Sequence, residues 1–388
     1  MKAISALLHN SSHTKPFEAE EFLSDAAMEK VHLLYFSPKL NASGYYRMLA
    51  PCLELAKTPF FNTHIMGLNK EDFNTPFELT TASVDDEWIL WADYMIFPIL
   101  TKDFLYFFKA CKVINPELQL VMDVDVLLHQ LPGYNPMQKK ISGSMLTAFE
   151  ANLNQVDIIT SPNEHILNFY QDFLKGQYGH STPFFAQLPN LISETGYQDI
   201  EAKAAPNNAT ICIGIVVNPR YTTDLLIVVE PLLEIQKKYA NKVIFVLYGW
   251  SGVLQDGSKP LAELDITYHK AVSIIDHFEK LSELSLDIAL IPVQNKASRR
   301  LISEVPYLEL ASLGIPVIAS RHSIFKEYIL DGATGNLVDG ASQWQRLIER
   351  HIEDKDYRKK LGEAAKAYVW EHYGYTEDNL QLFKELFF

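Results

Sequence analysis

Two acidic side chains near the start of one helix are the first candidates for chemistry in this sequence. Glu304 and Glu309 lie in the stretch SEVPYLELASLGIPVIAS, which runs from Ser303 to Ser320. The hydroxyl of Ser303 can cap the helix, and Pro306 falls in its first turn, where the missing N–H costs nothing. The backbone N–H groups and the dipole at a helix start attract anions. The stretch therefore predicts a phosphate site with carboxylates beside it.

Basic residues gather just before this helix. The polar loop from Gln294 to Arg300 ends in Arg299 and Arg300, and Arg220 follows an apolar run earlier in the chain. A helix dipole stabilises an anion by only ~0.3–2 kcal/mol, whereas the arginine fork adds charge and two parallel hydrogen bonds. A solvated basic turn is the competing interpretation for these residues. Their position beside the helix start favours phosphate binding.

A second acidic group follows a strand in the first half of the chain. Asp123 and Asp125 come directly after the apolar run LQLVM, and His129 lies four residues further on. Ligands of open α/β sheets bind outside the carboxyl ends of the strands, and ionised carboxylates bind sugar hydroxyls well. The alternative, that one aspartate caps the next turn, is about equally good. His129 could act as a base or bind a sugar, although an isolated histidine is more often a satisfied structural residue.

Small residues mark further places where backbone could approach a ligand. The loop Asn41 to Gly44 precedes a helix and places three side chains in its first turn, namely Tyr45, Tyr46 and Arg47. A plain surface turn explains this loop equally well. In the second half, the candidates are Gly214 within a strand, Gly249 after a strand and Tyr268 on a short strand.

Alternating apolar runs and amphipathic segments must position these residues. Strands are expected over 31–36, 63–66, 93–97, 118–122, 157–160, 184–188, 210–217, 243–248, 266–269, 287–292 and 315–319. Helices are expected over 45–57, 101–112, 143–154, 223–239, 303–313, 344–351 and 356–387, with a further helix capped at Ser161 in a Ser-x-x-Glu capping box. Such alternation predicts βαβ units with parallel sheets, and hence the α/β class.

Length and composition set the domain count and exclude some classes of function. A chain of 388 residues is comfortable for two domains, here 30–200 and 201–388 after an extension over 1–29, with a linker over 199–208. The net charge of −14 argues against a protein that coats nucleic acid or an anionic membrane. The three cysteines lack metal-ligand spacing, and no signal peptide or transmembrane segment is evident. We expect a cytoplasmic protein.

The motifs together resemble a known family. The helix with Glu309, the strand LGIPVIAS, the pair Lys326-Glu327 and the run from Asp331 to Val338 resemble the donor-binding half of retaining GT-B glycosyltransferases (group 1, family 4-like). The similarity is strongest over 211–373 and weaker over 31–190. It implies two facing Rossmann-like, doubly wound domains with a cleft between them, and a C-terminal helix that returns to the first domain.

The resemblance also implies an activity. It is that of a hexosyltransferase-type enzyme that moves a sugar from a nucleotide-sugar to a glycan, lipid-linked or protein acceptor, with retention and without a metal or other cofactor. Glu309 would hold the donor ribose, and the region of Tyr268 would border the base. Residues Gly44 to Arg47 would face the cleft, and Asp125 or His129 would contact the reacting sugar. A complex with other glycosyltransferases is a further expectation.

The chain departs from the family pattern at several positions. Leu301 stands where relatives carry a first Glu, Ile302 and Pro306 stand where a subgroup carries lysines, and Val126 replaces the last Asp of an Asp-x-Asp-Asp run. Glu304 or the arginines would have to replace the missing contacts to the transferred sugar. Two alternatives follow: a non-catalytic homologue that stabilises a partner transferase, and a sugar-nucleotide epimerase.

Overall fold

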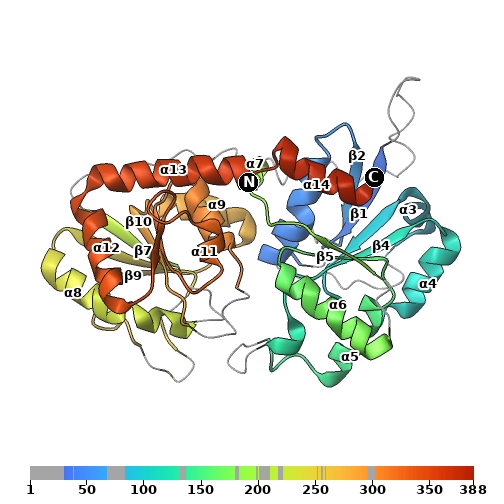
Figure 1. The fold of residues 1–388 in the computed structure, drawn as a ribbon, viewed down its shortest axis with the longest axis horizontal. Coiled ribbons are helices and arrows are strands. Elements are labelled where there is room, and N and C mark those ends of the chain that lie inside the picture. Colours follow the sequence, from blue (N-terminus) through green and yellow to red (C-terminus); the bar gives the residue numbers. More distant parts are fainter. Residues whose placement is uncertain are drawn as a thin grey trace. The chain divides into compact units, whose positions relative to one another are not determined.

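The computed structural model describes residues 30–37, 39–67, 84–131, 137–179, 183–197, 200, 210–216, 222–250, 252–254, 257, 259–295 and 302–388. The chain divides into two compact units, each built on one six-stranded sheet (Figure 1). Unit 1 comprises the described parts of Met1–Gln130, Lys139–Gln198 and Tyr375–Phe388. Unit 2 comprises the described parts of Leu131–Gln138 and Asp199–Gly374. The expected extension over 1–29 and almost all of the expected linker lie outside the described residues.

The sheet of unit 1 is parallel throughout, with the order β2-β1-β3-β4-β5-β6. Its strands are β1 (Val31–Phe36), β2 (Phe61–Met66), β3 (Tyr94–Phe97), β4 (Gln119–Asp123), β5 (Ile158–Ser161) and β6 (Phe184–Gln187). The inner strands are almost continuously apolar because helices cover both faces of such a sheet. Every strand expected from the sequence in this half is present, with its ends shifted by no more than two residues.

The helices of unit 1 follow the strands in alternation. They are η1 (a π-helix, Gly44–Leu49), α2 (Ala50–Leu55), α3 (Asp86–Trp91), α4 (Leu105–Ile114), η3 (a 3₁₀ turn, Leu128–Gln130), α5 (Gly143–Leu153), α6 (Glu164–Tyr178), α7 (Glu194–Tyr197) and α14 (Glu377–Phe387). Helix α14 belongs to this unit although it ends the chain, because Phe387 packs edge-on against Phe61 and Tyr94.

The capping box expected at Ser161 is wrong. Ser161 is the last residue of β5 and pairs with Gln187 of β6. Asn163 caps α6 instead, and its side chain accepts a hydrogen bond of 2.8 Å from the backbone N–H of His165. The sheet ladder extends β5 beyond the residue that local sequence favours as a cap, and asparagine two positions later caps equally well.

Unit 2 repeats the architecture, with the parallel order β12-β11-β10-β7-β8-β9. Its strands are β7 (Ile211–Val216), β8 (Val243–Tyr248), β9 (Ile266–His269), β10 (Ile288–Ile291), β11 (Val317–Ser320) and β12 (Asn336–Val338). Its helices are η4 (3₁₀, Thr222–Ile227), α8 (Val229–Tyr239), α9 (Ile274–Glu283), α10 (Val305–Ser312), α11 (Phe325–Tyr328), α12 (Ala341–Glu353) and α13 (Lys355–Tyr373).

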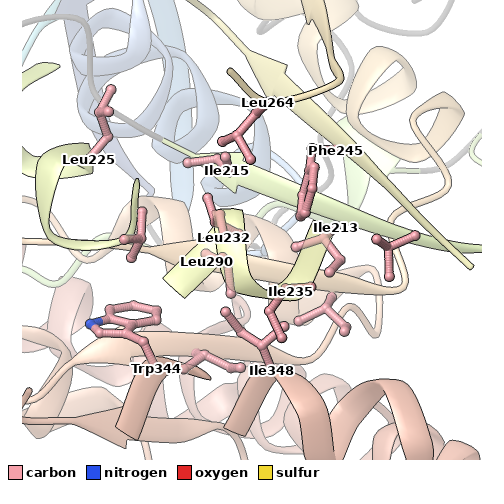
Figure 2. Packing of buried hydrophobic residues seen from close by; sticks show 14 of the residues in the cluster. Ile213, Ile215, Leu225, Leu232, Ile235, Phe245, Leu264, Leu290, Trp344 and Ile348 are labelled. Atoms are coloured by element: carbon pink, nitrogen blue, oxygen red, sulfur yellow. The ribbon is translucent and has the colours of Figure 1, made fainter. Parts of the chain in front are cut away.

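One hydrophobic cluster fills the space between this sheet and helices α8 and α12. Figure 2 shows Trp344 and Ile348 of α12 on one side of Leu232 and Ile235, with the strand residues beyond them. Alternate side chains of β7, β8 and β10 belong to the cluster, including Ile213, Ile215, Phe245 and Leu290, and further members come from β11, β12, η4 and the segment before β9. Strand residues one position away face the opposite layer, where α10 packs against β10 and α13. No helix within the described residues is both long and apolar enough to cross a membrane.

Candidate functional site

The candidate site of unit 2 lies at the carboxyl edge of its sheet. Because all strands are parallel, every strand-to-helix connection leaves from this edge. Tyr248 is the last residue of β8, His277 lies in the first turns of α9, and Glu309 is the fifth residue of α10. The topology therefore brings three polar side chains together from three separate segments of the chain.

Helix α10 ends at the glycine that its sequence predicts, but it begins at Val305 and is not capped by Ser303 as expected. Pro306 occupies the first turn, and Gly314 ends the helix in the left-handed conformation, with φ of 77°. The hydroxyl of Ser303 accepts a hydrogen bond of 3.2 Å from the backbone N–H of Val305, although Glu304 is the residue at the N-cap position. On the opposite side, the hydroxyl of Tyr307 donates to the backbone oxygen of Thr334 at 3.0 Å, which fixes the helix to the loop before β12.

A buried carboxylate already lies at the start of α10. Glu304 is 5% exposed, and its charge helps to raise the pKa values of Tyr328 and Tyr373, which burial raises first. The dipole at a helix start stabilises such a negative charge. The same charge opposes a phosphate bound directly on the helix axis, so a nucleotide at this edge needs cationic groups from the adjacent loop.

His277 joins Tyr248 to Glu309 in a hydrogen-bonded chain. Its Nε2 lies 3.0 Å from Oε2 of Glu309, and its Nδ1 lies 3.0 Å from the hydroxyl of Tyr248. An ionised carboxylate can only accept, so Nε2–H donates to Glu309 in both charge states of the imidazole. Burial on its own would lower the pKa of His277, but the charge of Glu309 and this hydrogen bond outweigh burial, and the pKa is raised.

Hydrogen bonds hold the segment that follows β10 against β11 and η4. The backbone N–H of Val293 donates to the hydroxyl of Ser320 at 2.9 Å, and His322 Nε2 lies 2.6 Å from the backbone oxygen of Val293. The side-chain amide of Gln294 donates to the backbone oxygen of Thr223 in η4 at 2.7 Å. These bonds fix the point from which the chain leaves the sheet toward α10.

The other residues expected in unit 2 have different surroundings. Gly249 turns the chain after β8 with φ of 89°, and Tyr268 is 43% exposed on edge strand β9. A Cβ on Gly214 would lie 2.4 Å from the side chain of Leu286, so this glycine makes room for a core residue. The remaining three expected residues, Arg220, Arg299 and Arg300, lie outside the described residues.

In unit 1, Arg47 is bound inside the fold. Its guanidinium donates to both carboxylate oxygens of Asp123, at 2.9 and 2.7 Å, and to the backbone oxygen of Leu188 at 2.8 Å. Arg47 is 7% exposed and Asp123 4% exposed. The pair therefore ties the first helix to the ends of β4 and β6. The adjacent cavity of about 10 Å³, which Thr160 also lines, has room for a single water molecule at most.

Asp125 lies just beyond β4 and is half-buried. The hydroxyl of Ser43 donates to its Oδ2, and the backbone N–H of Gly44 donates to the side chain of Asn41 at 2.9 Å, which shapes the loop around it. Burial raises the pKa of Asp125, the bond from Ser43 opposes this, and the charge of Asp123 raises it further. Tyr45 and Tyr46 are buried and pack edge-to-face on one another.

His129 lies in an aromatic cluster of unit 1. Its Nε2 is 2.8 Å from Oε1 of Glu150, and its ring packs against Phe173 with centroids 4.8 Å apart. The hydroxyl of Tyr170, which also accepts from the backbone N–H of Leu128, lies 3.3 Å from Nδ1. Both ring nitrogens of His129 thus have protein partners, as in many histidines with a structural role.

Sequence reasoning identified Glu309 but not its two partners. Tyr248 appeared only as the end of a strand, and His277 lies in a helix, α9, that was not predicted from the sequence. The one available signal was that each follows an expected strand, at the edge where α/β sheets bind ligands. Within the described residues, no group of three or more His, Cys, Asp or Glu side chains could hold a metal ion.

The comparisons with known proteins give one family-model match over part of the chain and one fold. Residues 305–368 match the family model described as glycosyl transferases group 1, and this segment includes Glu309. No curated protein matches the sequence.

Among solved structures, Alr3699/HepE from Anabaena, in complex with UDP and glucose, is similar, with a TM-score of 0.58 and 14% identity over 92% of this chain and 99% of that one. Sucrose-phosphate synthase from Thermosynechococcus elongatus (TM-score 0.54, 13% identity, 92% and 99% coverage) and a glycosyltransferase from Rickettsia africae (0.53, 16%, 92% and 97%) are similar too. At these identities the likeness shows the fold. The chain has the GT-B fold of two Rossmann-like units, as its sequence predicts.

Proposed function

We propose that this protein is a glycosyltransferase that takes a sugar from a nucleotide-sugar. One observation carries the proposal: Glu309, buried as the fifth residue of α10 at the carboxyl edge of unit 2, lies within the segment that matches glycosyl transferases group 1. A carboxylate there is suited to accept hydrogen bonds from the ribose hydroxyls of the donor. The UDP and glucose in the complex of the similar Anabaena protein support a nucleotide-sugar as the ligand class.

The remaining parts of the proposal concern the chemistry. We propose that Arg220, Arg299 and Arg300 neutralise the two phosphates, so that binding needs no divalent ion. Transfer then proceeds with retention to a glycan, lipid-linked or protein acceptor. In unit 1, Asp125 is the group proposed to bind a hydroxyl of the reacting sugar, with His129 as the second candidate. The raised pKa of Asp125 suits a group that exchanges a proton.

Thermal unfolding with UDP-, GDP- and ADP-sugars, in Mg²⁺ and in EDTA, tests the donor site. A ligand at ~100 times its dissociation constant adds roughly 2.7 kcal/mol of stability. We expect one nucleotide to raise the melting temperature equally with and without Mg²⁺. Glu309→Gln should reduce the shift to less than half, because a hydrogen bond to a charged group contributes about 1.5–3 kcal/mol.

A matched control comes from the same unit. Glu363 is exposed on α13, where it pairs with Lys359, and Glu363→Gln should leave the nucleotide shift unchanged. A shift of undiminished size in Glu309→Gln would contradict the donor-site assignment. No shift with any nucleotide would favour the non-catalytic homologue. Conversion of the donor sugar without any acceptor would favour the epimerase.

A further inference from the structure

Three side chains, one each from β8, α9 and α10, are hydrogen-bonded in series. Binding of a ribose by Glu309 does not by itself require this arrangement. His277 lies between Tyr248 and Glu309, with 3.0 Å to each. All three side chains are largely buried, and each comes from a different strand-to-helix connection. A carboxylate held on one oxygen by a fixed donor keeps one orientation, because its rotation would break that bond.

We propose that His277 is a positioning residue for nucleotide binding: it holds one oxygen of Glu309 and so fixes the orientation of the carboxylate toward the ribose of a nucleotide. The inference rests on the proposed function and deepens it by naming the residue that prepares the donor site. Tyr248 acts one step further back, because its hydroxyl holds Nδ1 and so prevents the imidazole from turning away from Glu309.

Protonation of His277 gives the arrangement a pH dependence. The groups facing the imidazole are Tyr248 from β8 and Glu309 from α10, and Asp276 neighbours it on α9. Burial raises the pKa of Tyr248 to about 12, so this phenol stays neutral at ordinary pH. Glu309 raises the pKa of His277 against the effect of burial. A protonated imidazole adds positive charge at a site proposed to bind an anionic ligand, so nucleotide affinity should rise as pH falls through the pKa of His277.

Calorimetric titration of the full chain with UDP, GDP and ADP, between pH 5.5 and 8.5, tests the proposal with two variants. His277→Phe removes the donor to Glu309 and should weaken nucleotide binding by about tenfold at pH 8.5, and by more at pH 5.5, because the variant also loses the increase that protonation gives the unaltered chain. His277→Gln keeps an N–H donor but cannot ionise. It should restore most of the affinity at pH 8.5 and lose the increase at low pH. His372→Gln, an exposed position on α13, should match the unaltered protein.

The pKa of His277, measured in the unaltered chain without ligand, tests the pairing with Glu309 even if a variant fails to fold. In the NMR titration of the unaltered chain, His277 should titrate above its ordinary pKa, and Glu309→Gln should lower that value. Titration of His277 below pH 6 would overturn the pairing on which the proposal rests. Binding of a nucleotide by His277→Phe with unaltered affinity would overturn the positioning role alone. Failure of the unaltered chain to bind UDP, GDP and ADP would overturn the proposed function itself.

Discussion

At the scale of single residues, the pH response of the fold depends on histidines in opposite environments. His277 lies beside a carboxylate, whereas His351 is fully buried on α12, and its Nε2–H donates to the side-chain oxygen of Asn336 at 2.8 Å. The pKa of His351 is lowered to about 4, chiefly by burial and then by the nearby charges of Arg358 and Arg350, against a smaller opposing effect of Asp354. The neutral form of His351 is therefore the one that the fold accepts.

This lowered pKa predicts an acid-sensitive contribution to stability. Between an unfolded pKa of about 6.5 and the folded value of about 4, the unfolded chain binds more protons, so stability falls as pH falls. From pH 7 to pH 5 the loss due to His351 should be on the order of 2 kcal/mol. His351→Gln keeps a donor for Asn336 but cannot ionise, and should lose less stability over this interval. Urea unfolding of both proteins at pH 7 and pH 5 measures the difference.

The comparison cancels the other titrating groups, because they are the same in both proteins. His277, whose pKa is raised, changes stability in the opposite direction, and its effect is lost as pH rises through its folded pKa. An equal loss in the variant and the unaltered chain would show that His351 is not the group responsible.

Residue identity predicted the site only where the signal was local. Glu309 could be placed because a proline in the first turn and a glycine at the end define its helix, and the structure confirms both. His277 and Tyr248 could not be connected to it, because the three residues meet only through the strand order of the sheet. Arg47 was expected to face a ligand, and its pairing with Asp123, 76 positions away, is equally invisible to local patterns.

At the scale of elements, strands were predicted better than helix starts. The strands over 31–36, 243–248 and 266–269 have the expected bounds. Helix α4 was expected from residue 101 but begins at Leu105, because the buried side chain of Asn152 bonds to the backbone of Leu100, Lys102 and Phe104 and holds them out of the helix. A long-range hydrogen bond of this kind overrides helix propensity.

Packing between elements can make a helical glycine more stabilising than alanine, which reverses the usual order. Replacing a helical glycine by alanine ordinarily stabilises by roughly 0.5–1 kcal/mol. In α13, however, a Cβ on Gly362 would lie 2.1 Å from the backbone oxygen of Gly314, at the turn after α10. We expect Gly362→Ala to destabilise the protein by about 1–3 kcal/mol, because backbone atoms at the contact must move.

Gly176 provides the matched control for this substitution. It lies in α6 with no atom within 4 Å of its ideal Cβ, so Gly176→Ala should raise stability slightly. Chemical unfolding midpoints of the two variants should therefore move in opposite directions. Two changes of the same sign would show that the close approach of α13 to the turn after α10 does not limit the size of residue 362.

At the scale of the whole molecule, the chain forms two similar sheets and carries a strong negative charge. The alternation of strands and helices predicts both units, and the structure confirms two six-stranded parallel sheets. Because the chain carries a net charge of −14, long-range electrostatics oppose the approach of an anionic nucleotide. Binding must therefore depend on local groups at one edge of one unit. A nucleotide bound at such a site should protect that edge, whereas a general effect would stabilise the whole protein.

Hydrogen exchange with and without a nucleotide can make that distinction. If UDP, GDP or ADP binds at the carboxyl edge of unit 2, amides after β8, in the first turns of α9 and at the start of α10 should exchange more slowly. Amides within α8 and α12, the two helices that pack on the cluster of Figure 2, should change little, because their local openings do not involve the site. Mass-spectrometric exchange on the full chain resolves these segments. Uniform slowing across both units would indicate general stabilisation, and slowing confined to the end of β4 would move the nucleotide site to unit 1.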